Sequence, residues 1–177
     1  MTLITGNAGK TAEFAALLGV EVANEKVKLT EIQALDVADV ARHKAAEAYV
    51  KIGRPVFVDD TGFALDAWGG LPGALIAWFL KTVGNQGVLE MARGLEDRGV
   101  EVKTALGYAD ESGVQVFCGS LRGTLATEER GSEGFGYDPI FIPEGSECTF
   151  AEMSAAEKNE ISMRRLAADE MRRSLGL

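Results

Sequence analysis

The hydrophobic pattern of the first third of the chain alternates between strand and helix periodicity. Residues 2–5 predict a short buried strand, and residues 10–18 predict a helix whose apolar side chains form one stripe. Further along, Val27, Leu29 and Glu31 occupy alternate positions, which predicts one face of a second strand. Strand and helix periods in succession indicate a sheet on which helices pack.

The next segment repeats this order. Residues 36–52 have helical spacing of apolar side chains, and Pro55 then opens the apolar strand 56–58, which we expect to end at Asp59 and Asp60. Because adjacent strand residues point to opposite faces, we expect only one of these two carboxylates to face a site.

The remainder of the chain predicts a pair of helices, a hairpin and a helical end. A glycine- and proline-rich turn precedes an apolar helix with Leu75, Trp78 and Phe79, and later patterns predict a helix over 86–95 and paired antiparallel strands over 100–109 and 114–127. We therefore expect an α/β fold, with a single domain over residues 1–177. Its central mixed, twisted β-sheet is flanked by helices, and two lobes hold a substrate cleft between them.

Charge narrows the classes of ligand. The chain has 27 acidic and 18 basic residues and a net charge of −9, which argues against a surface for DNA or RNA. A small polyphosphate is different, because a few lysines and a divalent cation bind it locally. The acidic balance is compatible with a nucleotide as ligand.

Cysteine, histidine and apolar runs add little chemistry. Cys118 and Cys148 lack metal-type spacing, so we expect reduced thiols, and the lone His43 is expected on a helix surface. No leader pattern and no long apolar span occur, so we expect a cytoplasmic protein without membrane contact.

The N-terminal TGNAGKT is similar to a phosphate-binding P-loop, but its spacing fails. A P-loop requires a glycine five residues before Gly9, and that position is Ile4. What the segment retains is a strand, a glycine turn and a helix N-terminus for which Asn7 is a candidate cap. Free N–H groups and the helix dipole favour phosphate at such a place.

The most informative segment runs from Gly134 to Arg164 and reads GFGYDPIFIPEGSECTFAEMSAAEKNEISMR. It places glycines that permit close approach, two aromatic rings and a carboxylate upstream of two cations. A flat, polar, anionic ligand fits this combination, because a ring stacks on its base and cations meet its oxygens.

Together with TGNAGK and VFVDDTG, this segment resembles the inosine triphosphate pyrophosphatase family, over nearly the whole chain from Thr5 to Arg164. The family hydrolyses non-standard purine nucleoside triphosphates to the monophosphate and pyrophosphate. The resemblance implies such an enzyme acting on ITP, dITP and XTP, with Mg²⁺ as cofactor, and a homodimer.

The resemblance also assigns residues to the phosphates and the metal. It implies that Asp60 binds Mg²⁺ and is a candidate general base, that Glu31 is a second metal ligand, and that Lys44 contacts phosphate. Thr61 would lie near the substrate, and Lys10 would neutralise the triphosphate. The triphosphate would be held by the turn of Thr5, Gly6, Asn7, Ala8, Gly9 and Lys10.

The second group of residues would recognise the base. Phe135 would stack on the purine, Gly136 and Tyr137 would shape the pocket, Asp138 would accept the N1–H of an oxo-purine, and Arg164 would donate to its 6-oxo group. Adenine presents the opposite donor and acceptor pattern, so buried groups left unpaired would disfavour it by about 1–3 kcal/mol each.

Helix geometry constrains Lys158 and Arg164, which both belong to the expected site. On one continuous helix they would lie about 240° apart and could not meet the same nucleotide. We therefore predict a break between them, with Ser162 as the N-cap of the final helix. Ser154 and Glu157 predict a capping box for the short helix before it.

One position departs from the family pattern. The family usually reads Ser-His-Arg where this chain has Met163 between Ser162 and Arg164. Methionine still packs against a ring, but a base-contacting polar group is lost.

Three alternatives stay open: the same chemistry with relaxed or shifted base preference, a nucleotide sensor without turnover, and an interaction protein that uses Trp78 and Phe79. The helical spacing of these two residues with Leu75 favours a position in the core or on a dimer face for their side chains.

Overall fold

The computed structural model describes residues 1–6 and 8–177, and only the backbone of residues 8 and 9. Within them, a seven-stranded sheet has the order β2-β1-β3-β5-β6-β7, and β4 pairs with β3. The strands are β1 (Thr2–Ile4), β2 (Ala23–Glu25), β3 (Val56–Leu65), β4 (Pro72–Gly73), β5 (Gly99–Asp110), β6 (Gly113–Leu125) and β7 (Phe141–Pro143).

The sheet is mixed, as predicted. Strand β1 runs parallel to β2 and β3, whereas β3, β5 and β6 pair antiparallel over most of their length. The parallel pairing of β1 with β3 ends at Leu3 and Phe57, but β3 continues to Leu65. Residues 59–61 of β3 therefore lie beyond the end of β1.

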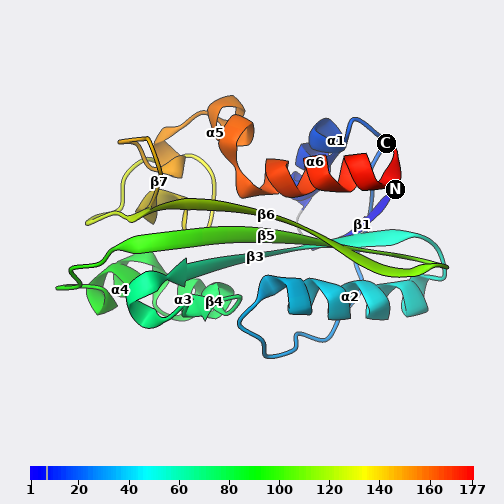
Figure 1. Ribbon diagram of the computed structural model, residues 1–177, viewed down its shortest axis with the longest axis horizontal. Helices are drawn as coiled ribbons and strands as arrows, with labels where there is room; N and C mark the ends of the chain where they lie inside the picture. Colours follow the sequence, from blue (N-terminus) through cyan, green and yellow to red (C-terminus); the bar gives the residue numbers. More distant parts are fainter. Residues whose placement is uncertain (7) are drawn as a thin grey trace.

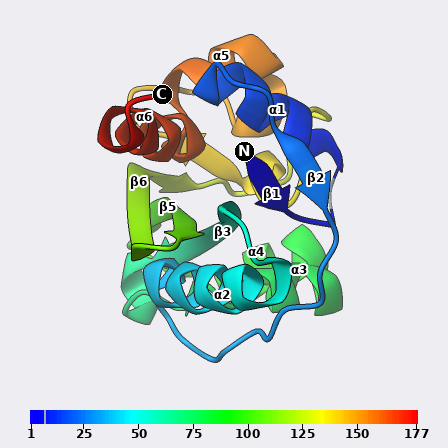
Figure 2. The ribbon, with the colours of Figure 1, turned by 90° about the vertical axis from the view of Figure 1, so that its right-hand side faces the viewer.

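In the part of the chain that the structure describes, six α-helices cover the two faces of this sheet (Figure 1). Helices α2, α3 and α4 lie on one face, and α1, α5 and α6 lie on the other, as the turned view in Figure 2 also shows. Their bounds are α1 (Ala8–Leu18), α2 (Val37–Ile52), α3 (Ile76–Thr82), α4 (Gly84–Met91), α5 (Ala155–Ile161) and α6 (Met163–Leu175). This arrangement confirms the α/β class and the flanked mixed sheet.

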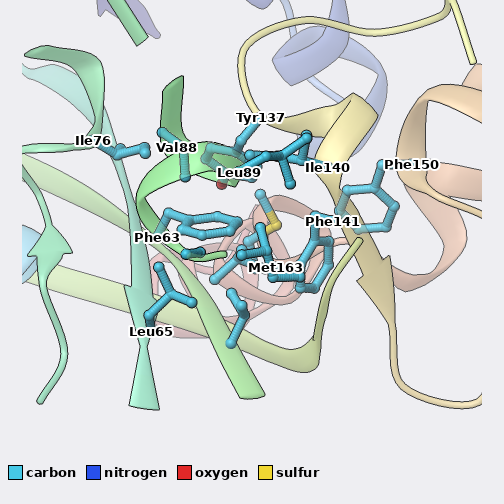
Figure 3. Packing of buried hydrophobic residues seen from close by; sticks show 14 residues of the cluster. Phe63, Leu65, Ile76, Val88, Leu89, Tyr137, Ile140, Phe141, Phe150 and Met163 are labelled. Carbon is cyan, nitrogen blue, oxygen red and sulfur yellow. The ribbon is translucent and has the colours of Figure 1, made fainter. Parts of the chain in front are cut away.

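Buried apolar side chains form a core on each side of the sheet. Phe14, Phe57 and Met171 belong to the cluster beneath α1 and α6, and Val56 and Ala45 belong to the cluster beneath α2. A third cluster, shown in Figure 3, joins α3 and α4 to the segment around Tyr137 and Phe141. Among the described residues, no helix is both long and apolar enough to cross a bilayer.

Helix caps account for the break that the sequence predicted near the C-terminus. Ser162 ends α5 and caps α6, and its hydroxyl accepts the N–H of Arg165. Ser154 and Glu157 form the predicted capping box at the start of α5. Two short helices in different directions replace one continuous helix, which lets Lys158 and Arg164 face the same cavity.

Three predicted elements have different bounds. Residues 26–34 are not a strand, because β2 pairs with β1 over three residues only and then leaves the sheet. Strand β3 does not end at Asp60, since β5 supplies backbone partners as far as Leu65. Helix α4 ends at Met91, whereas the predicted helix ended at residue 95.

The structure also revises the prediction for the Trp78 and Phe79 pair. Phe79 packs against the core cluster of Figure 3, but the Trp78 residue is 58% exposed. Trp78 is therefore not a core residue, and it lines a cavity of about 440 Å³ together with most of the predicted site residues. His43 is exposed on α2, as predicted, and both cysteines are free thiols.

Candidate active site

A cavity of about 440 Å³ opens where β3 extends past the end of β1. It is lined by residues from both helical layers and from the edge of β3, so it lies between the two lobes that the sequence predicted. Most of the predicted site residues meet here: Lys10, Glu31, Lys44, Asp60, Thr61, Phe135, Gly136, Tyr137, Asp138, Lys158, Met163 and Arg164.

Lys44 of α2 joins two carboxylates at one side of the cavity. Its Nζ lies 2.7 Å from Asp60 Oδ2 and 2.6 Å from Glu31 Oε1. Burial is the largest influence on Asp60 and raises the pKa of its carboxyl, Lys44 opposes this, and Glu31 and Asp59 add to the rise. Burial alone would lower the pKa of the Lys44 ammonium, but its two ion pairs raise it. The pKa of Asp60 is therefore raised mainly by burial, whereas that of Lys44 is raised by the two carboxylates that it contacts.

The donor set of this group suits a hard divalent cation. Two carboxylate oxygens converge on the point now taken by the Lys44 ammonium, and Glu31 is 60% exposed at its side chain. Mg²⁺ is usually held by one or two carboxylates together with substrate phosphates. The two carboxylates of Asp60 and Glu31 therefore fit such a cation.

Glu31 reaches this group from an extended segment outside the sheet. Val27 and Leu29 line a smaller cavity together with Glu31, so the alternation seen in the sequence is real although no strand forms. The segment is held by α2, because the Thr30 N–H donates to Glu47 Oε2 at 2.7 Å. Side-chain contacts with a helix take the place of a strand partner.

Asp59 also faces the cavity, which corrects the expectation that only one of the two aspartates does so. The two side chains point to opposite faces of β3, as predicted, but the open edge of the strand admits both. Asp59 Oδ2 lies 2.8 Å from Lys10 Nζ and 3.4 Å from Arg164 Nη2. Burial by itself would raise the pKa of Asp59, and these two cations lower it below its ordinary value.

The N-terminal turn borders the smaller cavity of about 230 Å³, which Thr5 and Gly6 line. Lys10 lines both cavities, so the turn lies next to the 440 Å³ cavity. Ala8 and Gly9 belong to the first turn of α1, where free N–H groups favour an anion. The proposed cap Asn7 lies outside the described residues.

Residues 134–138 form a turn closed by its own carboxylate. Asp138 Oδ2 accepts the N–H of Phe135 at 2.7 Å and pairs with Lys158 Nζ at 2.5 Å. Gly134 has a φ of +74°, and a Cβ there would lie 2.1 Å from Asp138 Oδ2, so this turn requires glycine. The half-exposed ring of Phe135 has Lys158 Nζ at 5.0 Å and Arg164 Cζ at 5.5 Å from its centroid.

Tyr137 and Met163 form the buried side of this region. Burial raises the pKa of the Tyr137 phenol, and its hydroxyl has no hydrogen-bond partner among the described residues. Met163 is buried in the same cluster, where Figure 3 shows it near Phe63 and Phe141. The position at which the sequence departs from the family pattern is therefore an apolar part of the pocket wall.

Four residues of the site were missed or set aside at the level of sequence. Asp59 was set aside in favour of Asp60, and Glu13, which pairs with Arg164 at 3.0 Å, shows no pattern that distinguishes it from a solvated helix residue. Asn85 donates from the start of α4 to the Gly136 carbonyl at 2.9 Å, a contact across 51 residues. Trp78 was expected in the core or on a dimer face, not at the cavity. Only the adjacent-aspartate pair offered a signal in the sequence.

Comparison with known proteins finds similar sequences and folds over nearly the whole chain. The model described as Ham1 family matches residues 1–174. The dITP/XTP pyrophosphatase of Hyperthermus butylicus is 40% identical over 98% of this chain and 93% of its own length. The inosine triphosphate pyrophosphatase of Kluyveromyces lactis is 38% identical over 99% and 95%. A solved HAM1 protein from Coxiella burnetii superposes with a TM-score of 0.88 at 28% identity, covering 99% of this chain and 97% of that one.

Proposed function

This chain belongs to the Ham1 family, and on that premise we propose that it hydrolyses non-canonical purine nucleoside triphosphates to the monophosphate and pyrophosphate. ITP, dITP and XTP are the proposed substrates, and removal of these nucleotides from the cellular pool is the proposed role. One observation carries the proposal: the Lys44, Asp60 and Glu31 group and the turn at residues 134–138 open into the same cavity.

We propose Mg²⁺ as the cofactor, with Asp60 and Glu31 as its protein ligands. Bound there, the ion would polarise the phosphate oxygens and offset their negative charge. The fit of the two carboxylates and the sharing of ligands with substrate phosphates support this assignment.

The protein side chains have separate roles in the proposed reaction. Lys10 and Lys44 donate to phosphate oxygens and stabilise charge that develops in the transition state. Asp60, which lines the cavity beside Lys44, is the candidate general base that accepts a proton from the attacking water. Water attacks the α-phosphorus, the bond to the bridging oxygen breaks, and pyrophosphate leaves. Thr61 lies beside this point on β3, next to Thr104.

The base would be recognised at the turn of residues 134–138. Phe135 provides a ring for stacking, and Oδ2 of Asp138 is engaged by two donors, which leaves Oδ1 for the N1–H of an oxo-purine. Arg164 has a buried Nε without a partner among the described residues, and this N–H is our candidate donor to the 6-oxo group. The apolar environment of Met163 supports a second candidate, the same hydrolysis with a relaxed base preference.

The test is pyrophosphate release from ITP, XTP, GTP, ATP and dUTP, with Mg²⁺ and with EDTA. We expect turnover of ITP and XTP above that of ATP, its loss in EDTA, and a fall of at least about 10²-fold in Asp60→Asn. Equal turnover of all bases would favour the relaxed enzyme. Binding of ITP without any release of pyrophosphate would replace the proposal with a nucleotide sensor.

The proposal includes a cytoplasmic homodimer. The exposed Trp78 on α3 is a candidate for the dimer surface, although it also lines the cavity. Sedimentation of the wild type and of Trp78→Ala measures the oligomeric state. A monomer in both would remove this part of the proposal and leave the proposed hydrolysis as it stands.

A further inference from the structure

Asp59 lies between the two halves of the cavity. Its Oδ2 contacts Lys10, which follows the N-terminal turn, at 2.8 Å, and Arg164, which faces the base pocket, at 3.4 Å. Among the described residues, no other carboxylate contacts both cations. Glu13, the other partner of Arg164, lies 3.0 and 3.1 Å from Nη1 and has no contact with Lys10 there.

This arrangement leaves hydrogen-bonding capacity unused. The side chain of Asp59 is 1% exposed, and its Oδ1 has no partner among the described residues. Arg164 is 3% exposed, and its Nε also lacks one. Buried polar groups without partners are costly, so a rearrangement that gives each of these two atoms a partner is favourable. The long contact of 3.4 Å between these two residues has room to shorten.

A bound triphosphate would start that rearrangement. Phosphate oxygens compete with Asp59 for the Lys10 ammonium, and a buried carboxylate that loses one cation has to rely on the other. Asp59 would then interact more strongly with Arg164 and fix its guanidinium in one orientation.

We propose that Asp59 is a positioning residue that couples phosphate binding at Lys10 to the orientation of Arg164, so that the triphosphate tightens recognition of the base. This inference rests on the proposed function of the same cavity. By linkage, the base tightens phosphate binding by the same factor. The discrimination between bases is then greatest for a nucleotide that carries the leaving pyrophosphate.

Two half-ligands measure the coupling without turnover. Inosine presents the base without charge, and inorganic pyrophosphate presents the phosphates, so neither repels the other directly. We titrate inosine into the wild type by calorimetry, with and without saturating pyrophosphate and Mg²⁺. We expect pyrophosphate to tighten inosine binding at least about fivefold, the low end of usual coupling factors.

Variants of Asp59 and Glu13 distinguish coupling between the two ligands from a purely structural role in holding Arg164. Asp59→Asn should bring the coupling factor close to one, and Asp59→Glu should restore part of it. Glu13→Gln, the matched control, should weaken inosine binding and keep the coupling factor of the wild type. A wild-type coupling factor in Asp59→Asn, or a factor close to one in the wild type, would overturn the inference.

A second measurement on the wild type guards against a variant that does not fold. The ¹⁵N resonance of Arg164 Nε, assigned with Arg164→Lys, should shift when pyrophosphate alone is added. An unchanged resonance at saturating pyrophosphate would overturn the coupling. Hydrolysis of ITP is measured separately from both readouts. If the enzyme is active but shows no coupling, only the proposed role of Asp59 is wrong. If it releases no pyrophosphate, the proposed function is wrong.

Discussion

The side-chain amide of Asn85 donates a hydrogen bond of 2.9 Å to the carbonyl oxygen of Gly136. It ties the start of α4 in one lobe to the turn at residues 134–138 in the other. The neighbouring Leu80 supports the same turn, since its Cδ1 lies 3.7 Å from where a Cβ of Gly136 would be. The proposed base pocket is therefore held from both sides of the cavity.

Removing this contact should loosen the base pocket. We expect Asn85→Ala to raise KM for ITP about fivefold, the equivalent of the roughly 1 kcal/mol that one such hydrogen bond contributes, with a smaller effect on kcat. Steady-state kinetics with ITP measure both constants. Gln86→Ala, at the exposed neighbouring position, is the control and should leave KM unchanged. A fall in kcat alone would mean that the contact does not serve substrate binding.

Lys44 occupies the point at which Asp60 and Glu31 converge, and a divalent cation would compete with it. Lys44→Met should therefore strengthen binding of Mn²⁺ in the absence of nucleotide, while kcat/KM for ITP falls about 10²-fold because a donor to the phosphates is lost. Paramagnetic resonance of free Mn²⁺ measures the first effect. Lys26→Met removes an exposed charge just after β2 and should change neither quantity. Weaker Mn²⁺ binding in Lys44→Met would contradict the proposed metal site.

Substitution of Met163 tests whether this part of the pocket wall determines the preference between bases. Met163→His places an imidazole in an apolar cluster, which should lower the free energy of unfolding by about 1–3 kcal/mol. It should also raise the ratio of kcat/KM for ITP over that for ATP, because a polar group returns to the base site. Met163→Leu should keep the ratio of the wild type. An unchanged ratio in Met163→His would show that residue 163 does not select the base.

Glu47 gives the stability a defined dependence on pH. The ion pair with Lys51 and the N–H of Thr30 lower the pKa of Glu47 from 4.5 to about 2. A lowered pKa in the folded state means that this stabilisation is present above 4.5 and is lost as the pH falls towards 2. The melting temperature of the wild type should therefore fall as the pH decreases through this range.

Glu47→Gln isolates this contribution. The variant should melt below the wild type at neutral pH and approach it near pH 2. Glu111→Gln, at the β5–β6 hairpin, is the control and should follow the wild type at every pH. A parallel loss of melting temperature in Glu47→Gln and wild type would remove Glu47 as the source of the acid sensitivity.

The order and type of most elements were predictable from the sequence, because local periodicity and caps determine them. The Ser162 cap and the Ser154–Glu157 capping box are both local signals, and both are confirmed. The β5–β6 hairpin also follows from alternation around a short turn. Strand ends were less predictable, since the length of β3 depends on β5, a partner more than 30 residues away.

The sequence by itself determined which residue types are available for the proposed chemistry: lysines beside a glycine turn, two adjacent aspartates, and an aromatic turn followed by two cations. Only the tertiary structure decided how they meet. The early end of β1 opens the edge of β3, so both Asp59 and Asp60 reach the cavity. Alternation along one strand cannot reveal this, because the space on each side of a strand depends on its neighbours. The contacts of Asp59, Glu13 and Asn85 come from packing between distant segments, which no local pattern encodes.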